Sequence, residues 1–141
     1  MKQNKPNSRR RFIKQAGLLT AATNLGIFAA AKAESMNANQ PFIHHVYFWL
    51  HNPESKDDYK KLIEGLQKLS KVKTIKDFYI GKPADTKREV IDSSYSVSWL
   101  LFFKNRADQD SYQTDPVHLK FVEECSHLWK KVVVYDTVDA V

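Results

Sequence analysis

Residues 94–104 alternate between two kinds of side chain, which is the pattern of a β-strand whose two faces meet different surroundings. One face is apolar throughout and consists of Tyr95, Val97, Trp99, Leu101 and Phe103. The other face begins with three serines, at positions 94, 96 and 98, and ends with Leu100 and Phe102. Such a strand belongs in a sheet that packs on helices with one side and is partly covered on the other.

The segments around this strand also have clear periodicities. In chain order the sequence predicts strands over 43–50, 74–80, 94–104 and 131–138, helices over 55–71 and 116–129, and a short helical turn over 107–112. This order, βαββαβ, predicts a ferredoxin-like α+β fold with one antiparallel sheet, two helices on one face, and the first and third strands in the middle. The second face is partly apolar, so we expect a second copy of the chain to cover it.

Two helix starts can be predicted from local chemistry. Ser55 is followed three residues later by Asp58, which forms a capping box at the start of the first helix. Asp115 precedes Pro116, which indicates an N-cap followed by proline at the first position of the last helix.

The charge of the chain is unevenly distributed. Of 22 basic residues, seven lie in residues 1–33, where there is no acidic residue. The remaining 108 residues hold 15 basic and 16 acidic groups, which argues against a nucleic-acid-binding domain. The single cysteine, Cys125, excludes an intramolecular disulfide and a cysteine-based zinc cluster.

The basic N-terminus has the features of an export signal. Residues 8–14 (SRRRFIK) match the twin-arginine pattern with Arg9 and Arg10, and a weakly apolar run follows over 16–31. That run is too short and too polar for a membrane span, and a small-x-small cleavage pattern ends at Ala33. We therefore predict a signal peptide over 1–33, a linker over 34–41, a periplasmic mature domain, and membrane contact only during export. The other interpretation is a basic tail before an amphipathic helix.

The five histidines differ in their expected surroundings. On the last helix, His118 shares the apolar face with Val122, Cys125 and Trp129, whereas His127 lies on the polar face. An inward histidine is more often a core residue than a catalyst. His51 follows the first strand, and no pair of histidines has a recognisable metal-binding spacing.

His44 and His45 are neighbours on a strand, so they point to opposite faces and cannot serve one site together. A helix in this fold reaches only one face of the sheet. A partner of His118 on the first strand must therefore lie on the helix-facing side, and periodicity alone leaves both faces open.

Three separated motifs carry a resemblance to a known family: IHHVYF at 43–48, YQTDPVH at 112–118, and the segment from Trp129 through Val134-Tyr135-Asp136. With these, the region 42–139 resembles the stress-responsive A/B barrel (Dabb) family. The resemblance implies a homodimer in which two sheets close a dimeric α+β barrel.

A plant polyketide cyclase of this family uses a tyrosine and a histidine six residues apart, and these positions match Tyr112 and His118. A further pocket histidine of the cyclase matches His45, which favours the face of His45 as the helix-facing one. Other positions depart from the cyclase: Asp115 and Val97 stand where it has histidines, and its first-helix tyrosine falls near Leu66. The resemblance thus names His118, Tyr112 and His45 as candidate catalytic residues.

These observations leave three hypotheses open. The first is a cyclase, lyase or isomerase without a cofactor that acts on a small apolar carbonyl compound, with His118 as the base. The second is a non-catalytic, stress-related dimer that binds a small apolar ligand in the same pocket, with His118 fixing the joint before its helix. The third is a haem-handling barrel, which is supported only by His118 and the export signal. We expect no metal and no cofactor.

Overall fold

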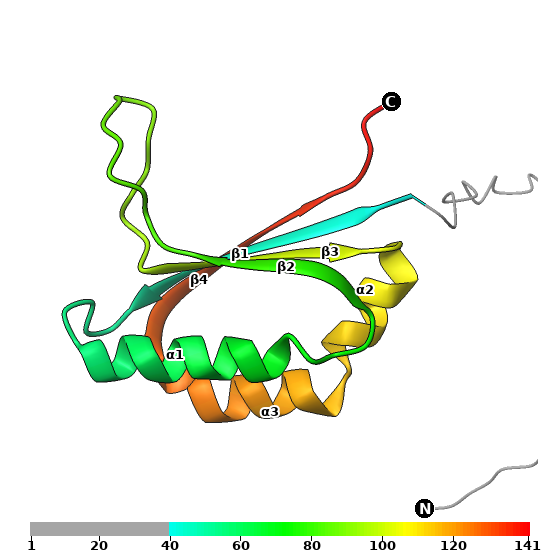
Figure 1. Ribbon diagram of the computed structural model, residues 1–141, viewed down its shortest axis with the longest axis horizontal. Helices are drawn as coiled ribbons and strands as arrows, with labels where there is room; N and C mark the ends of the chain where they lie inside the picture. The colour runs from blue at the N-terminus through cyan, green and yellow to red at the C-terminus, as the bar shows by residue number, and fades with distance from the viewer. Residues whose placement is uncertain (1–39) are drawn as a thin grey trace, which may run out of the picture. The chain divides into compact units, whose positions relative to one another are not determined.

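The computed structural model describes residues 40–141, so the predicted export signal and most of the predicted linker lie outside the described residues. Four strands form one antiparallel sheet in the order β2-β3-β1-β4 (Figure 1). The elements are β1 Phe42–Leu50, α1 Lys56–Leu69, β2 Ile75–Gly81, β3 Val97–Phe103, α2 Arg106–Gln113, α3 Pro116–Cys125, a 3-10 turn Ser126–Leu128 and β4 Trp129–Thr137. The ferredoxin-like α+β fold is confirmed, with the first and third strands in the middle of the sheet.

The helices of residues 40–141 all lie on one side of the sheet (Figure 1). The core between the two layers is built from Leu62, Leu66 and Leu69 of α1, from alternate residues of β1 and β3, and from Tyr112, Phe121 and Leu128. Gly65 permits the close approach of α1 to α3, because a Cβ atom at this position would lie 2.8 Å from the Cys125 sulfur.

Local chemistry places the helix starts as expected. The Ser55 hydroxyl accepts a hydrogen bond from the backbone N–H of Asp58 at 3.1 Å. The Asp58 carboxylate turns to Asn52 instead of closing the box on Ser55, whose N–H donates to the Asn52 carbonyl. Asp115 caps α3 by accepting from the N–H of Val117 at 2.7 Å. The predicted helical turn before it is a complete helix, α2, with Asn105 as its N-cap.

The helix-facing side of β1 is the face of His44, and the prediction that His45 faces the helices is wrong. Phe42, His44, Val46, Phe48 and Leu50 are buried, while the residues between them are only partly buried. Side chains alternate strictly along a strand, so the apolar set occupies the core and carries His44 with it. His45 is thereby placed on the opposite face.

The opposite side of the sheet, which we call the open face, has no helix over it (Figure 1). It carries Ile43, His45, Tyr47 and Trp49 of β1, Tyr79 of β2, Leu100 and Phe102 of β3, and Val133 and Tyr135 of β4. Tyr79 and Tyr135 are exposed by 66% and 61%. The described part of the chain therefore leaves a broad aromatic surface uncovered.

Candidate functional site

A cavity of about 320 Å³ lies between the sheet and helices α2 and α3. Most of its wall is apolar, and its polar residues are His44, Tyr112, Gln113, His118 and Ser126. The edge strand β4 contributes Val132 and Val134, each 44% exposed, so one side of the cavity is open to solvent. An apolar cavity with a few convergent polar groups is the usual form of a small-molecule site.

Two of the predicted site residues meet in this cavity. The rings of Tyr112 and His118 lie 4.6 Å apart between centroids. Tyr112 is fully buried at the end of α2, and its hydroxyl accepts a hydrogen bond from Trp99 Nε1 at 3.4 Å. Burial raises the pKa of Tyr112 above its ordinary value, so its hydroxyl stays protonated.

His118 is partly buried in the first turn of α3. Its Nδ1 lies 3.1 Å from the backbone carbonyl of Gln113, and a carbonyl can only accept. Nδ1 therefore carries the proton of the neutral ring, which leaves the lone pair on Nε2. Desolvation lowers the pKa of His118, with partial opposition from the Gln113 hydrogen bond, so the ring is neutral at pH 7. A neutral imidazole at this place can accept a proton.

The third polar group of the cavity is a histidine–carboxylate pair that the sequence analysis did not identify. His44 Nδ1 lies 2.6 Å from an oxygen of Asp136, and the His44 ring is 5.9 Å from that of Tyr112. Asp136 is the register partner of His44 across β1 and β4. A carboxylate on Nδ1 fixes the orientation of the ring and leaves Nε2 as its second nitrogen.

His45, the third candidate residue, is not part of this group. It lies on the open face, where its Nδ1 is 3.1 Å from the hydroxyl of Tyr47. Burial lowers the pKa of His45, with a smaller effect from the charge of His44. The remaining histidines, His51 and His127, are exposed. Within residues 40–141 there is no group of three or more metal-binding side chains.

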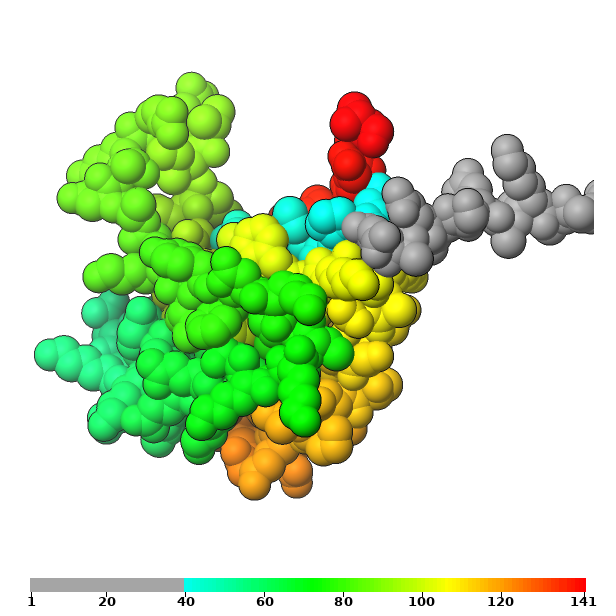
Figure 2. Space-filling model, turned by 45° about the vertical axis from the view of Figure 1, so that its right-hand side comes forward, coloured from blue at the N-terminus to red at the C-terminus, as the bar shows by residue number. Residues whose placement is uncertain are grey.

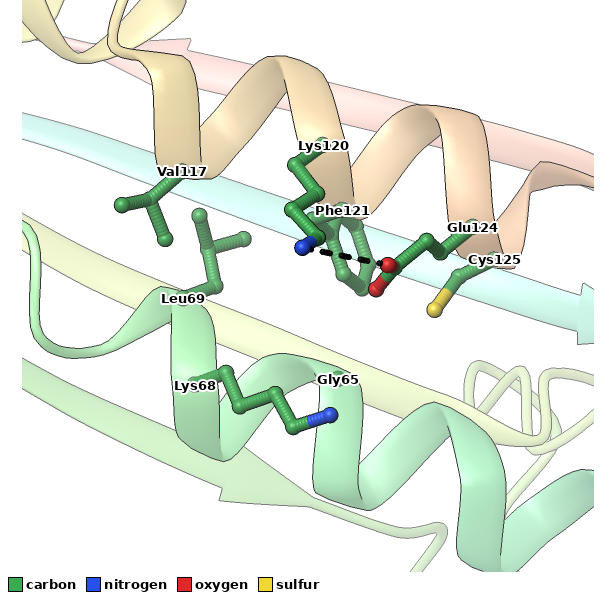
Figure 3. Close-up of a pocket in the computed structure, with 8 residues that line it drawn as sticks. All are labelled: Gly65, Lys68, Leu69, Val117, Lys120, Phe121, Glu124 and Cys125. Carbon is green, nitrogen blue, oxygen red and sulfur yellow. Dashed lines mark ion pairs between the residues drawn. The ribbon is translucent and has the colours of Figure 1, made fainter.

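A second hollow, of about 290 Å³, lies between α1 and α3 (Figure 3). Gly65, Leu69, Val117, Phe121 and Cys125 form its apolar wall. Its charged residues are Lys68, Lys120 and Glu124, of which the last two form an ion pair at 3.5 Å. It holds no histidine, tyrosine or other group that exchanges protons near neutral pH. The cavity between the sheet and helices α2 and α3, which we call the His44 cavity, is therefore the better candidate site.

Solved structures share this fold. A Dabb family protein with a ferredoxin-like fold from Mesorhizobium loti is 22% identical, with a TM-score of 0.60 over 72% of this chain and 99% of the other. A hydroxynitrile lyase from Passiflora edulis is 19% identical, with a TM-score of 0.60 over 72% and 94% of the two chains. A dimeric ferredoxin-like protein of unknown function from Thermobifida fusca is 15% identical, with a TM-score of 0.59 over 72% and 92%.

Among curated proteins, none matches the sequence significantly. The helices of residues 40–141 are all too short or too polar to cross a membrane. The family described as Stress responsive A/B Barrel Domain matches residues 43–139, which is most of the chain and contains every residue of the cavity. The three motifs that carried the resemblance lie within this match, and the chain therefore belongs to the stress-responsive A/B barrel (Dabb) family.

Proposed function

We propose that this protein binds a small, largely apolar molecule in the His44 cavity and transfers protons at an oxygen-bearing carbon of that molecule. The observation that carries the proposal is the convergence of two imidazoles on one apolar cavity, each with its Nδ1 held by a hydrogen bond. In both rings the remaining nitrogen, Nε2, is the one left to a ligand. An acid and a base on one substrate are the usual requirement for cyclases, lyases and isomerases without a cofactor.

In the proposed reaction, His118 acts as the base. Its neutral Nε2 takes a proton from a C–H or O–H group of the ligand, and negative charge develops on the neighbouring oxygen. The Tyr112 hydroxyl, kept protonated by burial, donates a hydrogen bond to that oxygen. His44, oriented by Asp136, supplies or removes the second proton. One protein with this fold, from Passiflora edulis, is a hydroxynitrile lyase, which supports enzymatic chemistry on such a scaffold.

A second candidate function is binding without catalysis. The contact between His118 Nδ1 and the Gln113 carbonyl favours it, because this hydrogen bond joins α2 to α3 and gives His118 a structural role. The two functions differ in what happens to the ligand, and they share the same pocket.

The experiment that separates them begins with ligand identification. The full chain is incubated with a panel of small apolar aldehydes, ketones and hydroxynitriles, binding is followed by native mass spectrometry, and conversion is followed by chromatography. The catalytic proposal predicts conversion by the wild type and binding without conversion by His118→Gln. Binding without conversion by both proteins would support the non-catalytic function. If neither protein binds any compound, the proposed role of the cavity as a ligand site is contradicted.

We also propose that the protein works as an exported homodimer. The N-terminal pattern around Arg9 and Arg10 supports export to the periplasm, with cleavage after Ala33. Replacing both arginines with lysine is expected to retain the precursor in the cytoplasm, and continued export of this variant would contradict the twin-arginine route. The uncovered open face supports a dimer, since a broad aromatic surface is rare on a monomer.

A further inference from the structure

The connection between β2 and β3 is the longest irregular segment in the described part of the chain. Its residues 82–93, which we call the arm, extend away from the sheet on the side opposite the helices (Figure 1). Figure 2 shows the arm standing clear of the body of the molecule. Long connections without secondary structure inside a small domain usually have a function of their own.

The root of the arm is fixed to the sheet. The hydroxyl of Ser94 accepts a hydrogen bond from Trp49 Nε1 at 3.0 Å, and the N–H of Ser96 donates to the Phe48 carbonyl at 2.7 Å. The ring of Tyr95 packs against that of Tyr47, with 4.8 Å between centroids. These contacts set the direction in which the arm leaves the open face.

The tip of the arm presents an apolar side chain to solvent. A hydrogen bond of 2.9 Å from the N–H of Ile91 to the Arg88 carbonyl closes a turn there. Val90, inside this turn, is 88% exposed. A valine in an ordered turn loses most of its contact with water when a partner covers it, which favours such a contact.

Beside the root, the open face has a hollow of about 290 Å³, which we call the aromatic hollow. It is lined by Tyr47, Trp49, Tyr95 and Tyr135, with Asp92 at its rim. The chain's own Val90 does not fill it, since that side chain is almost fully exposed. The aromatic walls favour an apolar occupant, and the carboxylate favours a basic neighbour to it.

We propose that in the dimer the arm of each copy reaches over the open face of the other copy and places Val90 in its aromatic hollow. This inference rests on the homodimer proposed above. In a two-fold dimer each such contact is made twice, so one arm and one hollow per chain are sufficient. The basic side chain of Arg88, two residues before Val90, complements the partner's Asp92 at the rim of the hollow.

The first test is sedimentation equilibrium of the full chain and of Val90→Asp. Since Val90 is exposed in the single chain, the variant is expected to fold normally and to raise the dissociation constant of the dimer at least tenfold. The matched control is Val117→Asp, an exposed valine in the helix layer, which is expected to leave the dissociation constant unchanged. If the wild type is a dimer and Val90→Asp forms an equally tight dimer, the arm contact is overturned and the homodimer is retained. A monomeric wild type overturns both.

The second test places cysteines on the two sides of the contact. In Val90→Cys/Tyr135→Cys, mild oxidation is expected to give a covalent dimer on a non-reducing gel, and neither single variant is expected to do so. Tyr135 is 61% exposed, and the native Cys125 is buried, which keeps the background low. A double variant that stays at the size of one chain, while the wild type sediments as a dimer, overturns the placement of the arm.

Discussion

At the scale of single residues, the two imidazoles of the cavity differ in what holds their Nδ1 atoms. His44 Nδ1 bonds the carboxylate of Asp136, and His118 Nδ1 bonds the peptide carbonyl of Gln113. Desolvation lowers the pKa of His118, so this ring is neutral near pH 7, as the base of the proposed reaction must be. In the proposed reaction His118 is therefore the base, and His44, held by Asp136, exchanges the second proton.

Substitution of His118 distinguishes a site from a scaffold. His118→Ala removes the hydrogen bond to Gln113 and leaves a space, which is expected to lower the free energy of unfolding by about 1–3 kcal/mol. His118→Gln keeps a polar end and similar bulk, so it is expected to recover much of this loss and to abolish conversion of the ligand. Thermal melts and activity measured on the same preparations check this. If the Gln variant retains full conversion, His118 is not the base.

The pH dependence of stability follows from the lowered pKa values of His118 and His45. In the unfolded chain both rings take a proton near pH 6.5, whereas the folded chain takes it only at lower pH. The contribution of these two rings to stability is therefore complete above about pH 7 and is lost as the pH drops through 6.5 towards 5. Melting temperatures across this range are expected to fall less steeply in His118→Gln and in His45→Gln than in the wild type. Equal slopes in all three proteins would contradict the direction of these shifts.

At the scale of elements, the start of α3 positions His118. Asp115 accepts a hydrogen bond from Val117 as the N-cap and is followed by Pro116 in the first turn. Asp115→Ala is expected to cost about 1 kcal/mol of stability, and Asp115→Asn, which keeps a capping oxygen, only a few tenths. Urea unfolding of the two variants measures this difference. Equal losses would show that the charge of Asp115, and not its hydrogen bond, stabilises the helix.

The sequence predicts most elements because each depends on local chemistry and periodicity. Caps at Ser55 and Asp115, and alternation in β1 and β3, are visible in short windows of sequence. The departures have longer-range causes. Regular strand pairing in β3 begins at Val97, three residues later than predicted, because Ser94 and Ser96 turn their hydroxyls to Trp49 and Leu50 of β1.

The candidate site also depends on contacts between distant parts of the sequence, which local patterns do not predict. Tyr112 and His118 are six residues apart, so one local motif contains both. The pair of His44 and Asp136 exists only through the register between β1 and β4, which no local pattern specifies. The relative burial of the two sides of β1 decides which side faces the helices, and the sequence does not show it. The motif match therefore favours His45, whereas the neighbouring His44 faces the cavity. The sequence therefore predicts the elements and the order of the strands, and it does not predict which side chains the register of β1 and β4 brings together.

At the scale of the whole molecule, the sheet separates two surfaces of different character. The helix side encloses the cavity with His44 and His118, and the open face carries aromatic side chains and the root of the arm. Neighbouring residues of β1 alternate between the two sides of the sheet. A substitution of His45 such as His45→Gln therefore affects the open face, and a substitution of His44 affects the cavity. Dimer formation and ligand chemistry can therefore be examined independently by choice of residue.

Leu100 tests whether the open face is the dimer interface. Leu100 lies on this face between His45 of β1 and Tyr79 of β2, so Leu100→Lys would bury an ammonium group in the contact between two copies. In a single chain the lysine can extend into water, and the fold is expected to survive. The variant is therefore expected to sediment as a folded monomer at micromolar concentration, where the wild type is expected to be a dimer. Leu119→Lys, at a leucine of α3 that is 56% exposed on the helix side, is the matched control and is expected to remain dimeric. Dissociation of the control but not of Leu100→Lys would place the interface on the helices and leave the aromatic surface of the sheet without a partner.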